Sequence, residues 1–135
     1  MGETILGSSF ALGPGGKGSN QAVAAARCNA EVSFISRLGQ DAFAQMALDM
    51  YTAEEIDARI EQTSDSYTGS AYIFIDDKTG DNAIIVCPGA AGTISPEYID
   101  GMADVIKRAD VFVTQLEQPL DAACLLYTSP SPRDS

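Results

Sequence analysis

The stretch GGKGSNQAVAAAR, residues 15–27, passes directly from a glycine-rich loop into an alanine-rich run. Because alanine is the best helix-forming residue, this run predicts a helix over about 19–28. Asn29 follows, and asparagine tolerates the left-handed conformation that often ends a helix. The loop and the helix start therefore form one unit, in which exposed backbone amides stand beside the polar residues Lys17 and Asn20.

Four interpretations of this loop compete. A Walker A loop requires GxxxxGK followed by Ser or Thr, whereas Lys17 is followed by Gly18, so that motif is absent. Gly13, Gly15 and Gly18 satisfy the dinucleotide pattern GxGxxG, but the expected first strand and acidic partner are not evident. A turn that merely begins a helix explains the glycines alone. A hydroxyl-binding loop also explains Lys17, which donates hydrogen bonds, and Asn20, whose amide donates and accepts them.

Hydrophobic periodicity predicts the elements that follow this helix. Strands are expected over 31–36, 69–77, 82–87 and 110–115, and helices over 41–51 (capped by Asp41), over 95–109 and from Pro119. The two strands 69–77 and 82–87 are joined by a short turn and predict a hairpin. The segment 52–62 is ambiguous, because Thr52 and Glu55 form a capping-box pattern that favours helix. This alternation predicts an α/β fold with a partly parallel sheet.

Composition excludes several classes of function. The 135 residues allow one domain or part of one, and 19 acidic residues against 8 Lys and Arg give a net charge of −11, which disfavours a nucleic-acid partner. The absence of histidine excludes histidine-based triads and histidine metal ligands. No stretch has the length of a membrane helix and no signal peptide is visible, so no membrane is expected. The widely spaced Cys28, Cys87 and Cys124 favour a reducing, cytoplasmic setting.

The segment GGKGSNQA (15–22), followed by Gly39, closely resembles the N-terminal sugar-binding motif of the ribokinase (PfkB) family of carbohydrate kinases. The resemblance continues in order through TGSAYIFID, GDNAII, PGAAGTISPE and VTQLEQPLDAA and covers about 1–123. It implies a ribokinase-like three-layer sandwich, here incomplete, with a small β-sheet lid that includes 69–87. An ordinary hairpin on the main sheet is the alternative. It also implies a strand near 58–62, and tertiary context often overrides a local helix pattern.

The resemblance implies transfer of a phosphoryl group from ATP to the primary hydroxyl of a pentose, D-ribose giving D-ribose 5-phosphate. Gly15, Gly16, Lys17 and Asn20 would hold the sugar hydroxyls, and Glu117 would accept one more. Mg²⁺ and a monovalent cation, K⁺, are implied as further cofactors, and a homodimer through the lid is implied as the assembly. A fructokinase, a deoxyribokinase, a nucleoside kinase or a non-catalytic sugar-binding module remain as alternatives.

Half of the kinase chemistry is expected to lie outside this sequence. The family's catalytic aspartate, which acts as general base, belongs to a GAGD-type motif that does not occur here. The ATP and cation sites are also expected beyond residue 135, and the first strand before residue 1. We therefore expect no catalytic residue, cofactor ligand or metal ligand in this chain, and no catalysis by it alone. Residues 124–135 resemble translated adapter sequence and are expected to form a non-native or disordered tail.

Overall fold

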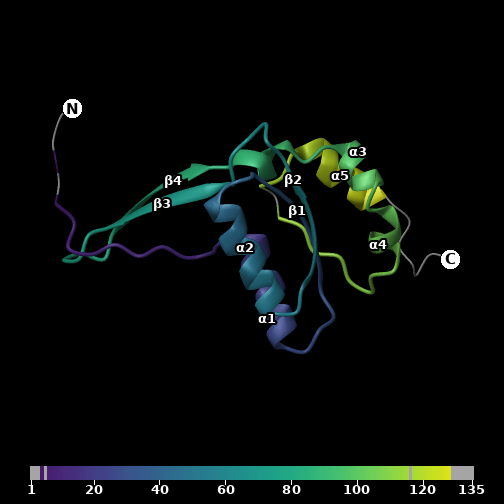
Figure 1. The fold of residues 1–135 in the computed structure, drawn as a ribbon, viewed down its shortest axis with the longest axis horizontal. Coiled ribbons are helices and arrows are strands. Elements are labelled where there is room, and N and C mark those ends of the chain that lie inside the picture. Colours follow the sequence, from purple (N-terminus) through teal and green to yellow (C-terminus); the bar gives the residue numbers. More distant parts are fainter. Residues whose placement is uncertain (1–3, 5, 116, 129–135) are drawn as a thin grey trace.

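The structure is a computed structural model that describes residues 4, 6–115 and 117–128. Its elements are, in order, α1 (Lys17–Arg27), β1 (Ser33–Leu38), α2 (Ala42–Ala53), β2 (Asp57–Gln62), β3 (Ser70–Ile75), β4 (Asn82–Cys87), the 3₁₀ helix η1 (Gly89–Thr93), α3 (Pro96–Asp100), α4 (Ala103–Lys107) and α5 (Leu120–Thr128). Figure 1 shows a body of helices around β1 and β2, from which the hairpin β3–β4 extends as an arm. The expected α/β class is confirmed.

Strands β1 and β2 form a parallel pair joined by helix α2, with Phe34 opposite Ala58 in the register. Two parallel strands need a crossover connection, which α2 supplies. Helix α2 begins at Asp41, whose carboxylate accepts a hydrogen bond from the Ala44 amide at 2.9 Å. The predicted cap is therefore confirmed. Helix α1 likewise ends as expected, since Asn29 follows it with φ +65°.

Helices cover both faces of the β1–β2 pair. On one face α1 and α2 pack around Tyr51, and Phe34 of β1 contacts this cluster. On the other face α3 and α5 pack through Ile99 and Ala122, and the adjacent strand residue Ile35 contacts them. Successive side chains of a strand point to opposite faces, which explains the division between Phe34 and Ile35. The helix–sheet–helix order is that of the expected three-layer sandwich.

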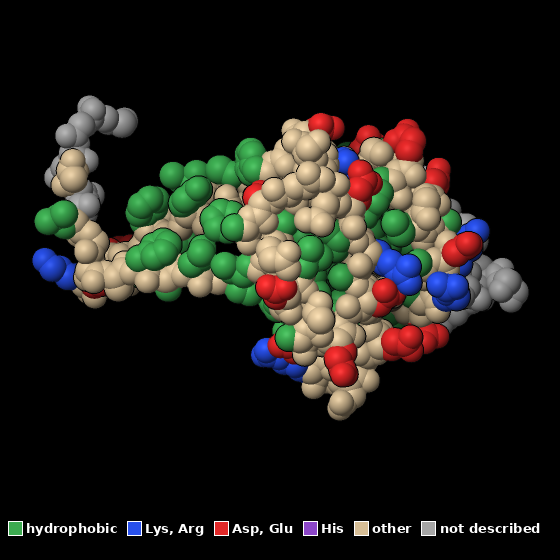
Figure 2. Space-filling view, viewed as in Figure 1, with side chains coloured by type: hydrophobic (Ala, Val, Ile, Leu, Met, Phe, Trp, Pro, Cys, Tyr) green, Lys and Arg blue, Asp and Glu red, His purple; other side chains and the backbone are tan. Residues whose placement is uncertain are grey.

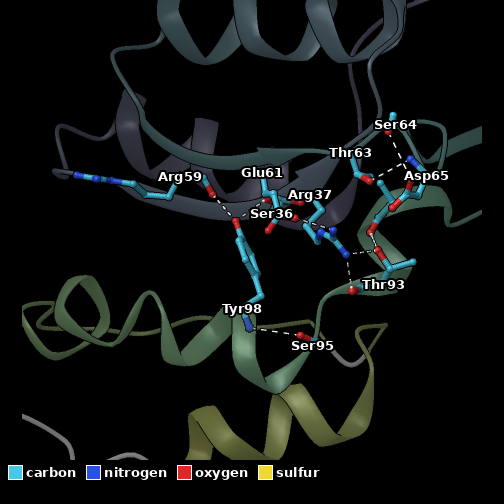
Figure 3. A network of polar contacts seen from close by, with 11 residues as sticks. Ser36, Arg37, Arg59, Glu61, Thr63, Ser64, Asp65, Thr93, Ser95 and Tyr98 are labelled. Atoms are coloured by element: carbon cyan, nitrogen blue, oxygen red, sulfur yellow. Dashed lines mark hydrogen bonds and ion pairs between the residues drawn. The ribbon is translucent and has the colours of Figure 1, made fainter.

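A polar network fixes the later helices to the sheet (Figure 3). The hydroxyl of Tyr98, in α3, lies 3.0 Å from the main-chain oxygen of Ser36 and 2.9 Å from that of Arg59. It therefore reaches both strands of the pair. Arg37 of β1 donates to the main-chain oxygen of Thr93, at the end of η1, at 2.8 Å. These bonds hold η1 and α3 on one face of the sheet.

The hairpin β3–β4 forms an antiparallel sheet of its own. At its turn the Asp76 carboxylate accepts a hydrogen bond from the Lys78 amide, and Gly80 takes φ +76°, which a glycine adopts at no steric cost. Its apolar side chains are exposed, Ile73 to 58% and Val86 to 70%. Figure 2 shows this arm as a largely hydrophobic surface. The expected hairpin is confirmed, and among the described residues no strand pairing joins it to the β1–β2 sheet.

The ambiguous segment 52–62 is mostly strand. Helix α2 ends at Ala53, Glu55 reverses the chain with φ +56°, and β2 then pairs with β1 along its whole length. The strand implied by the family resemblance is therefore confirmed, and the helix favoured by the capping-box pattern is wrong. Hydrogen bonding to β1 outweighs that local preference.

Two other expectations are wrong in detail. The helix expected over 95–109 is divided, because α3 ends before Gly101 and α4 begins only at Ala103. The segment 110–115 is not a strand, and within the described residues no strand is hydrogen-bonded to it. An apolar run becomes a strand only when a neighbour satisfies its backbone groups.

The end of the described chain is helical. Helix α5 continues to Thr128, so it includes residues 124–128 of the expected tail, and 129–135 lie outside the described residues. That 124–135 form a non-native or disordered tail stays a prediction. A search of the described residues for a helix both long and apolar enough to cross a bilayer finds none.

Candidate functional site

The glycine-rich loop meets the first turn of α1 in an open arrangement. Gly16 precedes the helix with φ +95°, a conformation that favours glycine. A Cβ atom added to Gly15 would meet no atom within 4 Å, so a ligand can approach this backbone closely. Among the described residues no side chain caps the helix. The first amides of α1 are therefore available to an acceptor group.

Lys17 and Glu117 form an ion pair at this helix start, although 100 positions separate them. Their side chains are 66% and 62% exposed. An exposed ion pair adds little to stability, so the consequence of this pair is mainly geometric. It places a carboxylate acceptor and an ammonium donor together beside the open backbone of Gly15 and Gly16.

A second contact joins the same two segments. Gln115 donates from Nε2 to the Oε1 atom of Gln21 at 2.6 Å. Gln21 lies one helical turn after Lys17, and Gln115 lies two residues before Glu117. Both glutamines lie within the family motifs GGKGSNQA and VTQLEQPLDAA, but neither is among the predicted site residues, because no local pattern links positions so far apart.

Asn20 adjoins this group without joining its contacts. It lies three residues after Lys17 on α1, so the two side chains share a face of the helix. Asn20 is exposed, and its side chain makes no hydrogen bond within the described part of the chain. The structure thus brings Gly15, Gly16, Lys17 and Glu117 together, with Asn20 alongside.

A buried hydrogen bond anchors the first turn of α1 to α2. The hydroxyl of Tyr51 in α2 donates to Oγ of Ser19 at 3.2 Å, and both residues are buried. Burial raises the pKa of Tyr51, so its hydroxyl keeps the proton that it donates. A Cβ on Gly18 would lie 3.4 Å from the ring of Phe34, so a glycine there lets α1 approach β1 closely.

The hairpin leaves the body at a tight crossing. Asp41 accepts hydrogen bonds from the amides of Thr68 at 2.8 Å and Ala44 at 2.9 Å, and these bonds, led by that of Thr68, lower the pKa of Asp41. The Gly39 amide donates to the Thr68 hydroxyl at 3.0 Å. A hollow of about 440 Å³ opens beside this crossing, with a lining that includes Phe43, Tyr67 and Tyr72.

None of the five predicted sugar-site residues lines this hollow, or a second one of about 560 Å³ between β2 and α3. The five residues instead lie on the exposed surface where the loop and the start of α1 meet Glu117. This surface is called the lip below. In the part of the chain that the structure describes, no group of three or more Cys, Asp or Glu side chains is placed to hold a metal ion. No residue here is therefore assigned to Mg²⁺.

The chain matches a family model described as pfkB family carbohydrate kinase over residues 1–125. It is 37% identical to a ribokinase of Bacillus subtilis (strain 168) over 127 residues, which are 91% of this chain and 43% of that protein. A solved structure of ribokinase from Giardia lamblia aligns with a TM-score of 0.83 and 32% identity, covering 93% of this chain and 41% of that one.

A structure of Arabidopsis thaliana ribokinase complexed with ribose and ATP aligns with a TM-score of 0.76 and 26% identity, covering 94% of this chain and 43% of that one. The chain thus spans about two fifths of the length of the relatives it matches. The family match extends over nearly the whole sequence, and it includes both the glycine-rich loop and Glu117. The chain belongs to the pfkB family of carbohydrate kinases.

Proposed function

We propose that this chain supplies sugar-binding residues of a ribokinase, and that the complete protein transfers a phosphoryl group from ATP to D-ribose, giving D-ribose 5-phosphate. The observation that carries the proposal is the meeting of Lys17 and Glu117 beside the open backbone of Gly15 and Gly16. The relatives named ribokinase, one of them solved with ribose and ATP, support the choice of sugar and phosphoryl donor.

The lip offers the mixed hydrogen bonding that a pentose needs. Lys17 donates, Glu117 accepts, and the amide of Asn20 does both. A hydrogen bond to a charged group contributes about 1.5 to 3 kcal/mol, so Lys17 and Glu117 are expected to dominate the affinity. A sugar that lacks the matching hydroxyl leaves one of these groups unpaired and is rejected.

The hairpin β3–β4 is proposed to be part of the lid over this sugar. Closure would exclude water and protect the phosphoryl group from hydrolysis. Exposed apolar side chains lie on both faces of the hairpin, with Ile73 opposite Ile84 on one face and Tyr72 opposite Ile85 on the other. Because both faces of the hairpin are apolar, each face needs a surface to pack against. This supports a homodimer in which one face packs against the neighbouring subunit.

The remaining parts of the reaction are proposed to lie outside this chain. They comprise the aspartate that takes the proton from the attacking hydroxyl, the ATP pocket and the sites for Mg²⁺ and K⁺, because no GAGD-type motif occurs in these residues. A cytoplasmic location is part of the same proposal. It is supported by the thiols of Cys28 and Cys87, which form no disulfide.

A coupled kinase assay on the complete protein tests this proposal, with D-ribose, 2-deoxy-D-ribose, D-fructose and adenosine as acceptors. We expect the highest kcat/KM with D-ribose. A higher value with another acceptor would assign the protein to a different member of the family. Binding of a sugar without transfer to any acceptor would indicate a sugar-binding module instead.

A further inference from the structure

The segment that carries Glu117 has little main-chain support. Residues 111–115 are in neither a helix nor a strand, and Val111 and Val113 are exposed. Among the described contacts, two side-chain links join this segment to α1, namely Lys17–Glu117 and Gln21–Gln115. On its other side Glu117 is held by α5, which begins at Leu120 and packs through Ala122, so the two links fix the approach of the segment to α1.

The two links differ in kind. The Lys17–Glu117 pair is exposed, and water and salt weaken such a pair and loosen its geometry. The link between Gln21 and Gln115 is a neutral amide–amide hydrogen bond of 2.6 Å, in which donor and acceptor have defined directions. A sugar hydroxyl that binds Glu117 would share its carboxylate with Lys17, whereas the glutamine pair does not involve that carboxylate.

We propose that Gln115, held by Gln21, is a positioning residue that keeps the Glu117 carboxylate over the sugar site. This inference rests on the proposed binding of ribose by Glu117 and adds the device that orients it. Lys17 and Gln21 are four residues apart on α1 and so lie one above the other. Glu117 pairs with Lys17 and Gln115 with Gln21, so the segment passes α1 in the opposite chain direction and the two links join helix and segment at successive turns.

Ribose binding to the complete protein that contains this chain, measured by isothermal titration calorimetry, tests the proposal with Gln21→Met, Gln115→Met and the double variant. Methionine keeps the side-chain length and removes the amide. Each single variant should weaken ribose binding about three- to tenfold, the range expected for one hydrogen bond, and the double variant should be no weaker than either single one. Gln45→Met is the matched control, because Gln45 is an exposed α2 glutamine bonded to Asp49.

Two readouts distinguish positioning from a general structural effect. With 2-deoxyribose and 3-deoxyribose as probes, Gln115→Met should reduce the same discrimination between sugars that Glu117→Gln reduces. The side-chain amide signals of Gln115 in the NMR spectrum should shift in Gln21→Met and stay in place in Gln45→Met.

The possible outcomes distinguish the positioning role of Gln115 from the proposed binding of ribose. Unchanged ribose affinity in Gln115→Met, or an equal loss for ribose and both deoxy sugars, would overturn the positioning role and leave the proposed function standing. A complete wild-type protein that binds no ribose would overturn the proposed function of this site, and the positioning role with it.

Discussion

Lys17, in the first turn of α1, and Glu117, just before α5, form an ion pair that joins two motifs from opposite ends of the described chain. Neither residue is buried, and the pair contributes little to the cohesion of the fold. Its position beside the open backbone of Gly15 makes it the centre of the proposed sugar site.

Loss of either charged residue should weaken ribose binding without unfolding the protein. Lys17→Ala and Glu117→Gln are each expected to raise the Kd for ribose about ten- to a hundredfold, because each removes a charged hydrogen-bonding partner. Calorimetric titration measures the change. Arg27→Ala is the control, since it breaks another ion pair at the far end of the same helix, with Glu54. Equal affinities in all three variants would contradict the assigned roles.

Gly39 should be intolerant of any side chain. A Cβ at this position would lie 2.6 Å from the amide nitrogen of Thr68 and 2.8 Å from the main-chain oxygen of Ser66. Because both neighbours are backbone atoms, Gly39→Ala is expected to reduce the free energy of unfolding by about 1 to 3 kcal/mol. Urea denaturation measures the loss. Gly13→Ala, where a Cβ meets nothing within 4 Å, should stay within about 0.5 kcal/mol of the wild type.

Asp41 should make the stability depend on pH. Its pKa is lowered from the ordinary 3.8 because the ionised carboxylate accepts amide hydrogen bonds from Thr68 and Ala44. Near that pH the folded state binds fewer protons than the unfolded state. The stabilisation is therefore present above the unfolded-state pKa and is lost as the pH falls through the lower, folded-state pKa.

Comparison of wild type and Asp41→Ala by urea denaturation tests this dependence. At pH 7 the variant should be less stable by about 0.5 to 2 kcal/mol, the range for loss of an N-cap side chain. At pH 3 and below, the difference in the free energy of unfolding between the wild type and Asp41→Ala should become smaller. A difference that stays constant from pH 7 to pH 2 would show that the hydrogen bonds of the ionised carboxylate do not contribute.

The apolar arm should drive self-association. Ile84 is exposed on β4 opposite Ile73, so Ile84→Lys places a charge in the middle of one face of the hairpin. Analytical ultracentrifugation should show a lower average mass for this variant than for the wild type. Leu120→Lys is the matched control, because Leu120 is also apolar and exposed but lies on α5. A wild-type chain that is monomeric at high concentration would contradict the proposed dimer.

Local sequence predicted the elements whose determinants lie within a few residues. Asp41 caps α2 by accepting a hydrogen bond from the amide of Ala44, three residues later. Gly80 closes the β3–β4 turn through its positive φ. The glycine-rich loop before α1 was predictable for the same reason. For the candidate site, the loop residues and Glu117 could be named from the motifs of the family, whereas nothing in those motifs indicates that the side chains of Gln21 and Gln115 meet.

What the sequence determined by itself is the set of local units, since caps, turns and apolar periodicity act over one to four neighbouring residues. The family resemblance already implied a strand near 58–62 where local patterns favoured helix, but only the tertiary structure decided that 110–115 is not a strand and that Lys17 pairs with Glu117. Each of these outcomes depends on a partner far along the chain. Local preferences amount to fractions of a kcal/mol per residue, so the presence or absence of that partner decides between the alternatives.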